Sequence, residues 1–173
     1  MSYFMVDIES DGPIPGDYSM ISLGAVLVDE KLDRTFYGEL KPISENHDPK
    51  ALAISGFSRE KTQTFDDPKT VMLNFKKWIE ENSKGRPIFI NDNNGFDWMF
   101  VCWYFHHFIQ ENPFGYSSRR ISDLYCGLEK DTFAKWKHLR KTTHTHNPVD
   151  DAMGNAEVLL HMKHEMDLKI SLK

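Results

Sequence analysis

Two carboxylates stand two residues apart where an apolar run ends, in the segment FMVDIESDGP at residues 4–13. Alternate side chains of a strand point to one face, so a strand here would direct Asp7 and Glu9 to the same place. Burying two like charges together is unfavourable unless a cation or a shared proton compensates. Either the strand ends and water solvates both acids, or the pair holds a cation.

Two later segments add acids of the same kind. Asp97 follows an apolar strand and a glycine in IFINDNNGFDWMFV, and Asp151 follows His146 in HTHNPVDDAMGNAEVLL. Each has a structural alternative, since Asp97 could cap a helix, and Asp150 and Asp151 could stabilise a helix dipole. As a set, Asp7, Glu9, Asp97 and Asp151 supply the oxygen ligands that Mg²⁺ or Mn²⁺ prefers. Two such ions would support phosphodiester hydrolysis.

The elements that must position these acids follow from periodicity and turn residues. Residues 3–9, 20–29 and 34–41 are expected to form three strands of an antiparallel meander, and residues 86–91 a further strand. Residues 68–82 have an amphipathic helical pattern, residues 96–109 are apolar nearly all round as in a buried helix, and the chain ends in a helix from Pro148 to about Met166. A short helical piece is expected near residues 49–56. No linker or repeat divides the pattern, so we expect one mixed α/β domain over residues 1–173.

In order along the chain, the motifs resemble those of the DnaQ-like, or DEDDh, exonuclease superfamily. Its Asp-x-Glu motif corresponds to Asp7 and Glu9, its Asn followed by Phe-Asp to Asn93 and Asp97, and its His five positions before an Asp to His146 and Asp151. The resemblance implies a ribonuclease H-like α/β fold, in which a mixed central sheet, made of a three-stranded antiparallel meander plus parallel strands, is flanked by helices. It also implies a metal-dependent 3′-to-5′ exonuclease that releases nucleoside 5′-monophosphates.

The resemblance assigns a role to each residue of the set. Asp7 would bridge two Mg²⁺ or Mn²⁺ ions, Glu9 and Asp151 would bind the ion that activates water, and Asp97 would lie nearer the second shell of ligands. His146 would be the general base, because an ordinary pKa of about 6.5 allows proton uptake near neutral pH. His144 lacks the family spacing, and we expect its replacement to be nearly silent.

Substrate contacts are predicted from signals that are less specific than the carboxylate motifs. Ser10, Asp11 and Gly12 follow the first motif, where the family's backbone approaches the 3′-terminal nucleotide, and Asn93 belongs to the second motif. Phe57 could stack on a base or belong to the core. The basic stretch KWKHLRKTTHTH, residues 135–146, could follow a phosphate backbone with Trp136 as a stacking surface, or be a solvated helix face. Asp11 and Asp92 depart from the family pattern and leave specificity open.

Composition limits the class of protein. The 173 residues carry a formal net charge of −5, no apolar stretch of membrane-spanning length and only two cysteines, so we expect a soluble, cytoplasmic protein without a disulfide framework. The expected partner is single-stranded RNA or DNA with a free 3′ end, with no membrane partner. The resemblance adds a homodimer. The alternatives are a catalytically inactive nucleic-acid-binding module of the same fold and a Ca²⁺-binding domain, although no EF-hand ligand pattern is present.

Overall fold

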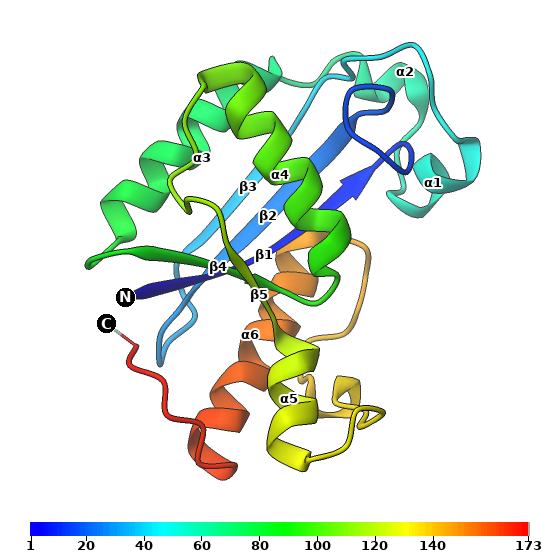
Figure 1. The fold of residues 1–173 in the computed structure, drawn as a ribbon. Coiled ribbons are helices and arrows are strands. Elements are labelled where there is room, and N and C mark those ends of the chain that lie inside the picture. Colours follow the sequence, from blue (N-terminus) through cyan, green and yellow to red (C-terminus); the bar gives the residue numbers. More distant parts are fainter. Residues whose placement is uncertain (173) are drawn as a thin grey trace.

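The computed structural model describes residues 1–172 of the chain, which fold around a five-stranded sheet with the strand order β3-β2-β1-β4-β5 (Figure 1). The strands are β1 (Ser2–Ser10), β2 (Met20–Val28), β3 (Thr35–Glu39), β4 (Pro87–Asn91) and β5 (Ser118–Arg120). β2 pairs antiparallel with β1 and β3, whereas β4 pairs parallel with β1 and β5. The predicted combination of an antiparallel meander with parallel strands is therefore confirmed.

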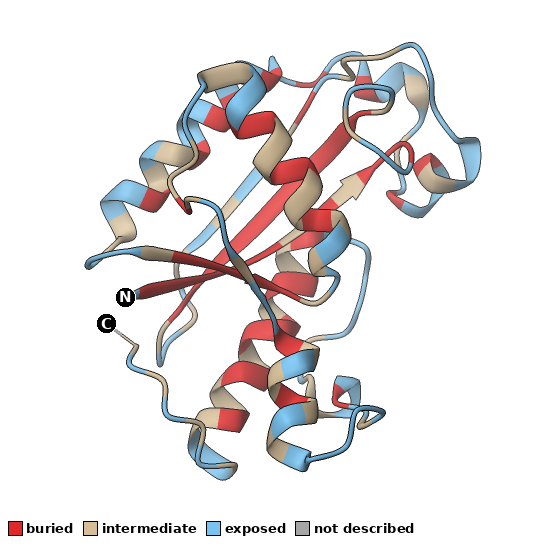
Figure 2. Cartoon of the chain, in the orientation of Figure 1, coloured by how far each residue is buried: buried red, intermediate tan, exposed pale blue. Residues whose placement is uncertain are grey.

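Helices cover both faces of this sheet (Figure 1). They are α1 (Pro49–Ile54), α2 (Arg59–Thr62), α3 (Pro68–Asn82), α4 (Asn94–Ile109), α5 (Ile121–Glu129) and α6 (Pro148–Glu165), with a 3-10 turn η1 at Lys137–Leu139. α3 and α4 pack on one face in an aromatic-rich core, and α5 and α6 pack on the other. The sheet lies between two layers of helix, and its central strands are the most deeply buried elements (Figure 2).

The central strand β1 shows how the pattern of residues directs the carboxylates. Its side chains are buried on both faces, as expected for a strand between helical layers. Phe4 and Val6 pack in the core beneath α3 and α4, whereas Tyr3 and Met5 pack toward α5 and α6. Because the side-chain period is two, Asp7 continues the row that faces α6, where no apolar residue follows.

The start of α6 is fixed by a cap and by a close approach to the sheet. Asn147 accepts a hydrogen bond from the Val149 amide at 2.9 Å, and Pro148 occupies the first turn, where its missing N–H leaves no unsatisfied donor. Gly24 of β2 lies directly beneath, and a β-carbon there would stand 2.3 Å from the carbonyl carbon of Pro148. The absence of a side chain at Gly24 thus lets the first turn of α6 lie against the sheet.

The region between residues 110 and 147 is where the sequence predictions were incomplete. β5 and α5 form there, although the three residues of β5 carry no apolar alternation that would predict a strand. The stretch at residues 135–146 contains only the short turn η1, so the solvated helix considered for it does not form. No helix within residues 1–172 combines the length and the apolar character needed to cross a membrane.

Candidate active site

The structure brings the four predicted carboxylates together in one pocket of about 230 Å³. Ligand oxygens of Asp7, Glu9 and Asp151 lie within 4.8 Å of one another, and Asp97, only 3% exposed, lines the same pocket. The residues come from three elements: β1, the first turn of α4 and the first turn of α6. Residues separated by more than a hundred positions in the chain therefore form one acidic cluster.

The parallel pairing of β1 and β4 explains why Asp97 reaches this cluster. Met5 lies opposite Ile90 in the sheet, so β4 ends at Asn91 beside the carboxylates of β1, and α4 begins three residues later. The Asn91 side-chain amide donates a hydrogen bond to Oδ2 of Asp97. Asn91 is fully buried and was missed by the sequence analysis, although an amide that ends an apolar strand is a recognisable signal.

Burial and mutual repulsion make the cluster electrostatically unfavourable. Burial is the largest cause that raises the pKa of Asp7 well above its ordinary value, and the neighbouring charges of Asp97, Asp151 and Glu9 raise it further. Burial, followed by the charge of Asp151, raises the pKa of Glu9 to about 7. Burial also raises the pKa of Asp97 to about 8, against the hydrogen bond from Asn91. Near neutral pH, these groups bind protons that a cation can replace.

Arg140 brings a positive charge to the carboxylate cluster. Its Nη2 donates to the backbone oxygen of Asp151 at 2.8 Å and lies 3.3 Å from Oδ1 of the same residue. The side chain is nearly buried, and Gly154 makes room for it, because a β-carbon there would stand 2.4 Å from Nε. The prediction that Arg140 follows a phosphate backbone is therefore wrong. Trp136 is likewise 3% exposed in the core beneath α6, so it offers no stacking surface.

A further observation on Asp151 indicates that these carboxylate oxygens fit a divalent cation. Its Oδ1 is contacted by Arg140 and His144, whereas its Oδ2 is buried and has no hydrogen-bond partner. A buried, unpartnered carboxylate oxygen beside two other carboxylates is a strong acceptor with no donor to satisfy it. Oxygen donors in such a group suit Mg²⁺ or Mn²⁺.

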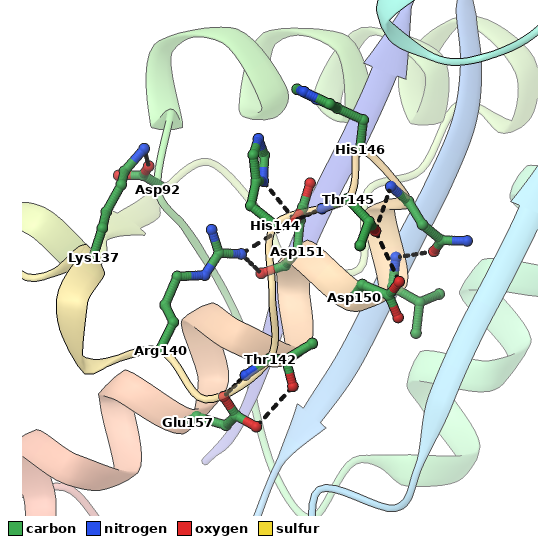
Figure 3. Close-up of polar contacts among 12 residues, drawn as sticks. Asp92, Lys137, Arg140, Thr142, His144, Thr145, His146, Asp150, Asp151 and Glu157 are labelled. Carbon is green, nitrogen blue, oxygen red and sulfur yellow. Dashed lines mark hydrogen bonds and ion pairs between the residues drawn. The ribbon is translucent and has the colours of Figure 1, made fainter.

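Both histidines of the loop before α6 lie at the pocket (Figure 3). Nδ1 of His146 is 3.6 Å from Oε1 of Glu9, and Nδ1 of His144 is 2.6 Å from Oδ1 of Asp151. His146 has a positive φ of 61°, an uncommon conformation for a residue other than glycine, and its ring packs edge-on against the ring of His144 with centroids 4.3 Å apart. The expectation that replacing His144 would be silent rested on spacing alone, and the contact with Asp151 removes its basis.

Polar contacts to α6 hold this loop in place. Glu157 accepts hydrogen bonds from the amide and the hydroxyl of Thr142, and the hydroxyl of Thr145 donates to Asp150 at 2.8 Å (Figure 3). Asp150 therefore faces the loop, whereas Asp151 faces the pocket. The loop and the first three turns of α6 form one polar unit that carries both histidines.

The residues expected to contact the 3′-terminal nucleotide lie elsewhere, apart from Asn93, which lines the pocket. Asp11 is fully buried, accepts a hydrogen bond from the Ser19 amide and pairs with Arg59 at 2.8 Å. Ser10 is buried, and its hydroxyl donates to the carbonyl of Gly12, which is itself buried. The side chains of Ser10 and Asp11 are thus engaged inside the protein, and contact of Ser10, Asp11 and Gly12 with a nucleotide stays a prediction.

Phe57 also lies outside the carboxylate pocket. Its ring packs edge-to-face on Phe65 with centroids 4.9 Å apart, next to a small cluster that includes Ile21 and Leu52. This position agrees with the core alternative considered for Phe57, and stacking on a base stays a prediction.

With this geometry in view, comparison with known proteins decides the family. The family model of the Rv2179c-like 3′-5′ exoribonuclease domain matches residues 2–162. The chain belongs to this family. An Escherichia coli relative, the 3′-5′ DNA exonuclease Cap18, is 34% identical over 169 residues, which is 96% of this chain and 88% of Cap18. The chain is accordingly a DnaQ-like 3′-to-5′ exonuclease that acts on nucleic acid.

Solved structures show the same fold at lower identity. The nuclease domain of 3′hExo, a DEDDh family member bound to rAMP, has a TM-score of 0.79 at 16% identity over 99% of this chain and 96% of that domain. Escherichia coli exonuclease I in complex with a dT13 oligonucleotide has a TM-score of 0.76 at 15% identity over 96% of this chain. The chain spans 42% of the exonuclease I structure. The predicted ribonuclease H-like fold is confirmed.

Proposed function

We propose that the chain is one exonuclease domain that uses two divalent ions, Mg²⁺ or Mn²⁺, to release nucleoside 5′-monophosphates from the free 3′ end of single-stranded nucleic acid. The meeting of Asp7, Glu9, Asp97 and Asp151 in one pocket carries this proposal. Arg140 is a single positive charge beside four carboxylates, so the cluster needs further cations once all four are ionised. The unpartnered Oδ2 of Asp151 points to the same need.

The proposed hydrolysis depends on the ions that the carboxylates would hold and on the proton that His146 would accept. Two bound ions supply charge neutralisation at the scissile phosphate and a lowered pKa for water. His146 takes a proton from the attacking water, since its half-exposed ring lies at the pocket beside Glu9. The water oxygen bonds to phosphorus, the bond from phosphorus to the 3′-oxygen of the preceding nucleotide breaks, and that oxygen takes a proton from solvent. His144 and Arg140 hold Asp151 in place.

The choice between RNA and DNA is part of the proposal. The family description names exoribonucleases, whereas the name of Cap18 specifies DNA. Both descriptions share a strand with a 3′ end, and the pocket is lined by carboxylates and histidines, whose proposed roles concern the phosphate that both nucleic acids share. We propose single-stranded RNA and DNA as substrates.

The test is hydrolysis of 5′-labelled single-stranded RNA and DNA of equal length, with and without chelator. The native chain with Mg²⁺ should shorten both strands one nucleotide at a time from the 3′ end. Asp151→Asn should lower the rate by roughly 10³-fold or more, because it removes an ionised ligand. Asp150→Asn is the matched control, since its remaining carbonyl oxygen still accepts from Thr145.

Two results would contradict the proposal. One is full activity in excess chelator, which would exclude the ions. The other is an equal loss in Asp150→Asn and Asp151→Asn, which would show that the start of α6 matters for folding and not for catalysis.

A further inference from the structure

A second cavity, of about 400 Å³, opens beside the carboxylate pocket. Asp92 and Lys137 line both hollows, and their side chains form an ion pair of 3.0 Å at the boundary. Figure 3 shows this pair on the far side of His144 and Arg140 from His146. The volume lies within the range of about 300–1,000 Å³ that is typical of sites for small ligands.

The side chains around the second cavity favour a negatively charged ligand. Three cations line it, namely Arg120, Lys135 and Lys137, against the two acids Asp92 and Asp123. Arg120 pairs with Asp123 and Lys137 pairs with Asp92. Lys135 is exposed, and none of the ion pairs among residues 1–172 includes it. A phosphate group that enters the cavity therefore meets Lys135, which these ion pairs do not include, and Lys137, which can exchange Asp92 for the phosphate.

An aromatic ring stands at the same cavity. Phe133 is 87% exposed, and its amide donates to Oδ1 of Asp131 at 2.9 Å, while the amide of Asp131 donates to the backbone oxygen of Cys126 at the end of α5. Cys126 of α5 contacts the backbone oxygens of Thr132 and Ala134 on either side of the ring. An exposed ring on an anchored turn, beside lysines, is the combination with which proteins bind single-stranded nucleic acid by stacking and charge.

The direction of the reaction decides which nucleotide this cavity would face. In an in-line displacement, the attacking and leaving oxygens lie on opposite sides of the phosphorus. His146 takes the proton of the attacking water in the function proposed above, so the leaving 3′-oxygen lies on the side away from His146. The ion pair of Asp92 and Lys137, which borders the second cavity, lies on that side (Figure 3).

We propose that the cavity lined by Phe133, Lys135 and Lys137 binds the nucleotide that precedes the 3′-terminal one. Its base stacks on Phe133, and its 5′-phosphate is bound by Lys135 together with Lys137, which releases Asp92 when the strand enters. This inference rests on the proposed function. Binding of the preceding nucleotide in this cavity makes the enzyme prefer an oligonucleotide over a substrate in which a small phenol replaces that nucleotide.

The experiment compares two substrates in the full chain with Mg²⁺: a single-stranded pentanucleotide and the p-nitrophenyl ester of thymidine 5′-monophosphate, which lacks a preceding nucleotide. For the double variant Phe133→Ala with Lys135→Ala, the ratio of kcat/KM for the oligonucleotide to that for the ester should fall roughly 10- to 100-fold, the scale of one lost stacking contact and one lost phosphate contact. Tyr116→Ala with Lys169→Ala is the matched control, because both side chains are at least 90% exposed and lie outside the cavity.

A ratio that stays within about twofold of the native value would overturn the inference. Binding of a labelled oligonucleotide in Ca²⁺ separates this failure from failure of the proposed function. If the native chain hydrolyses neither substrate, the proposed function is wrong. A weaker affinity of the double variant for the labelled oligonucleotide would still support the cavity as a nucleotide site. Equal affinity of the native chain and the double variant would exclude the cavity as a nucleotide site.

Discussion

Replacing Asp97 by Asn should flatten the pH dependence of stability in the metal-free protein. Burial raises the folded-state pKa of Asp97 to about 8, against about 3.9 in an unfolded chain. Between these values the folded state holds one more proton than the unfolded state, so stability falls as pH rises, by about 1.4 kcal/mol per pH unit. From pH 5 to pH 7, Asp97 thus contributes a loss of about 3 kcal/mol that Asp97→Asn should abolish.

The assay is unfolding by urea, followed by tryptophan fluorescence in chelator at pH 5, 6 and 7. In thermal unfolding, the same difference corresponds to about 6–12 °C in Tm for a chain of this size. Asp167→Asn is the control, because that side chain is 99% exposed and should leave the native pH slope unchanged. An equal slope in the native chain and in Asp97→Asn would refute the argument that burial and crowding keep Asp97 protonated in the absence of metal.

Two further changes test other parts of the site. His146→Ala should lower kcat by roughly 10²- to 10⁴-fold with little change in KM in steady-state kinetics. The loss of kcat should shrink as pH rises, because metal-bound water then ionises without a general base. An equal loss in the exposed control His138→Ala would contradict the role of His146. Gly24→Ala should destabilise the fold by about 1–3 kcal/mol, because its β-carbon meets the backbone of Pro148. Gly127→Ala, with nothing within 4 Å of the added carbon, should be neutral or slightly stabilising in the same urea titration.

Periodicity and turn chemistry were enough to predict most of the scaffold. α3 has the predicted bounds, Pro68–Asn82, because Asp67 caps it and its apolar residues recur on one face. The side-chain period of two placed Asp7 and Glu9 on the same face of β1, and parallel pairing with β4 brings Asp97 to that edge. Local rules succeed for the bounds of α3 and for the shared face of Asp7 and Glu9, because each of these two features is encoded within a few consecutive residues.

Features that depend on contacts between distant segments were missed. Arg140 looked like part of a basic surface stretch, and only the missing β-carbon of Gly154 on α6 lets it reach Asp151. Asp11 looked like a substrate contact, but Arg59, far along the chain, makes it part of a buried ion pair. No local pattern identifies such partners, since each depends on how whole elements pack.

The long sequence separation within the carboxylate pocket has a consequence for the protein during its synthesis. β1 and β4 leave the ribosome early, whereas Asp151 belongs to α6, which begins at Pro148 and docks against β2. A nascent chain that lacks α6 has no Asp151 and lacks the helix that holds the loop of the two histidines, and the apolar face that α6 covers is still open. The complete carboxylate pocket therefore forms only after α6 has been synthesised and has docked against the sheet.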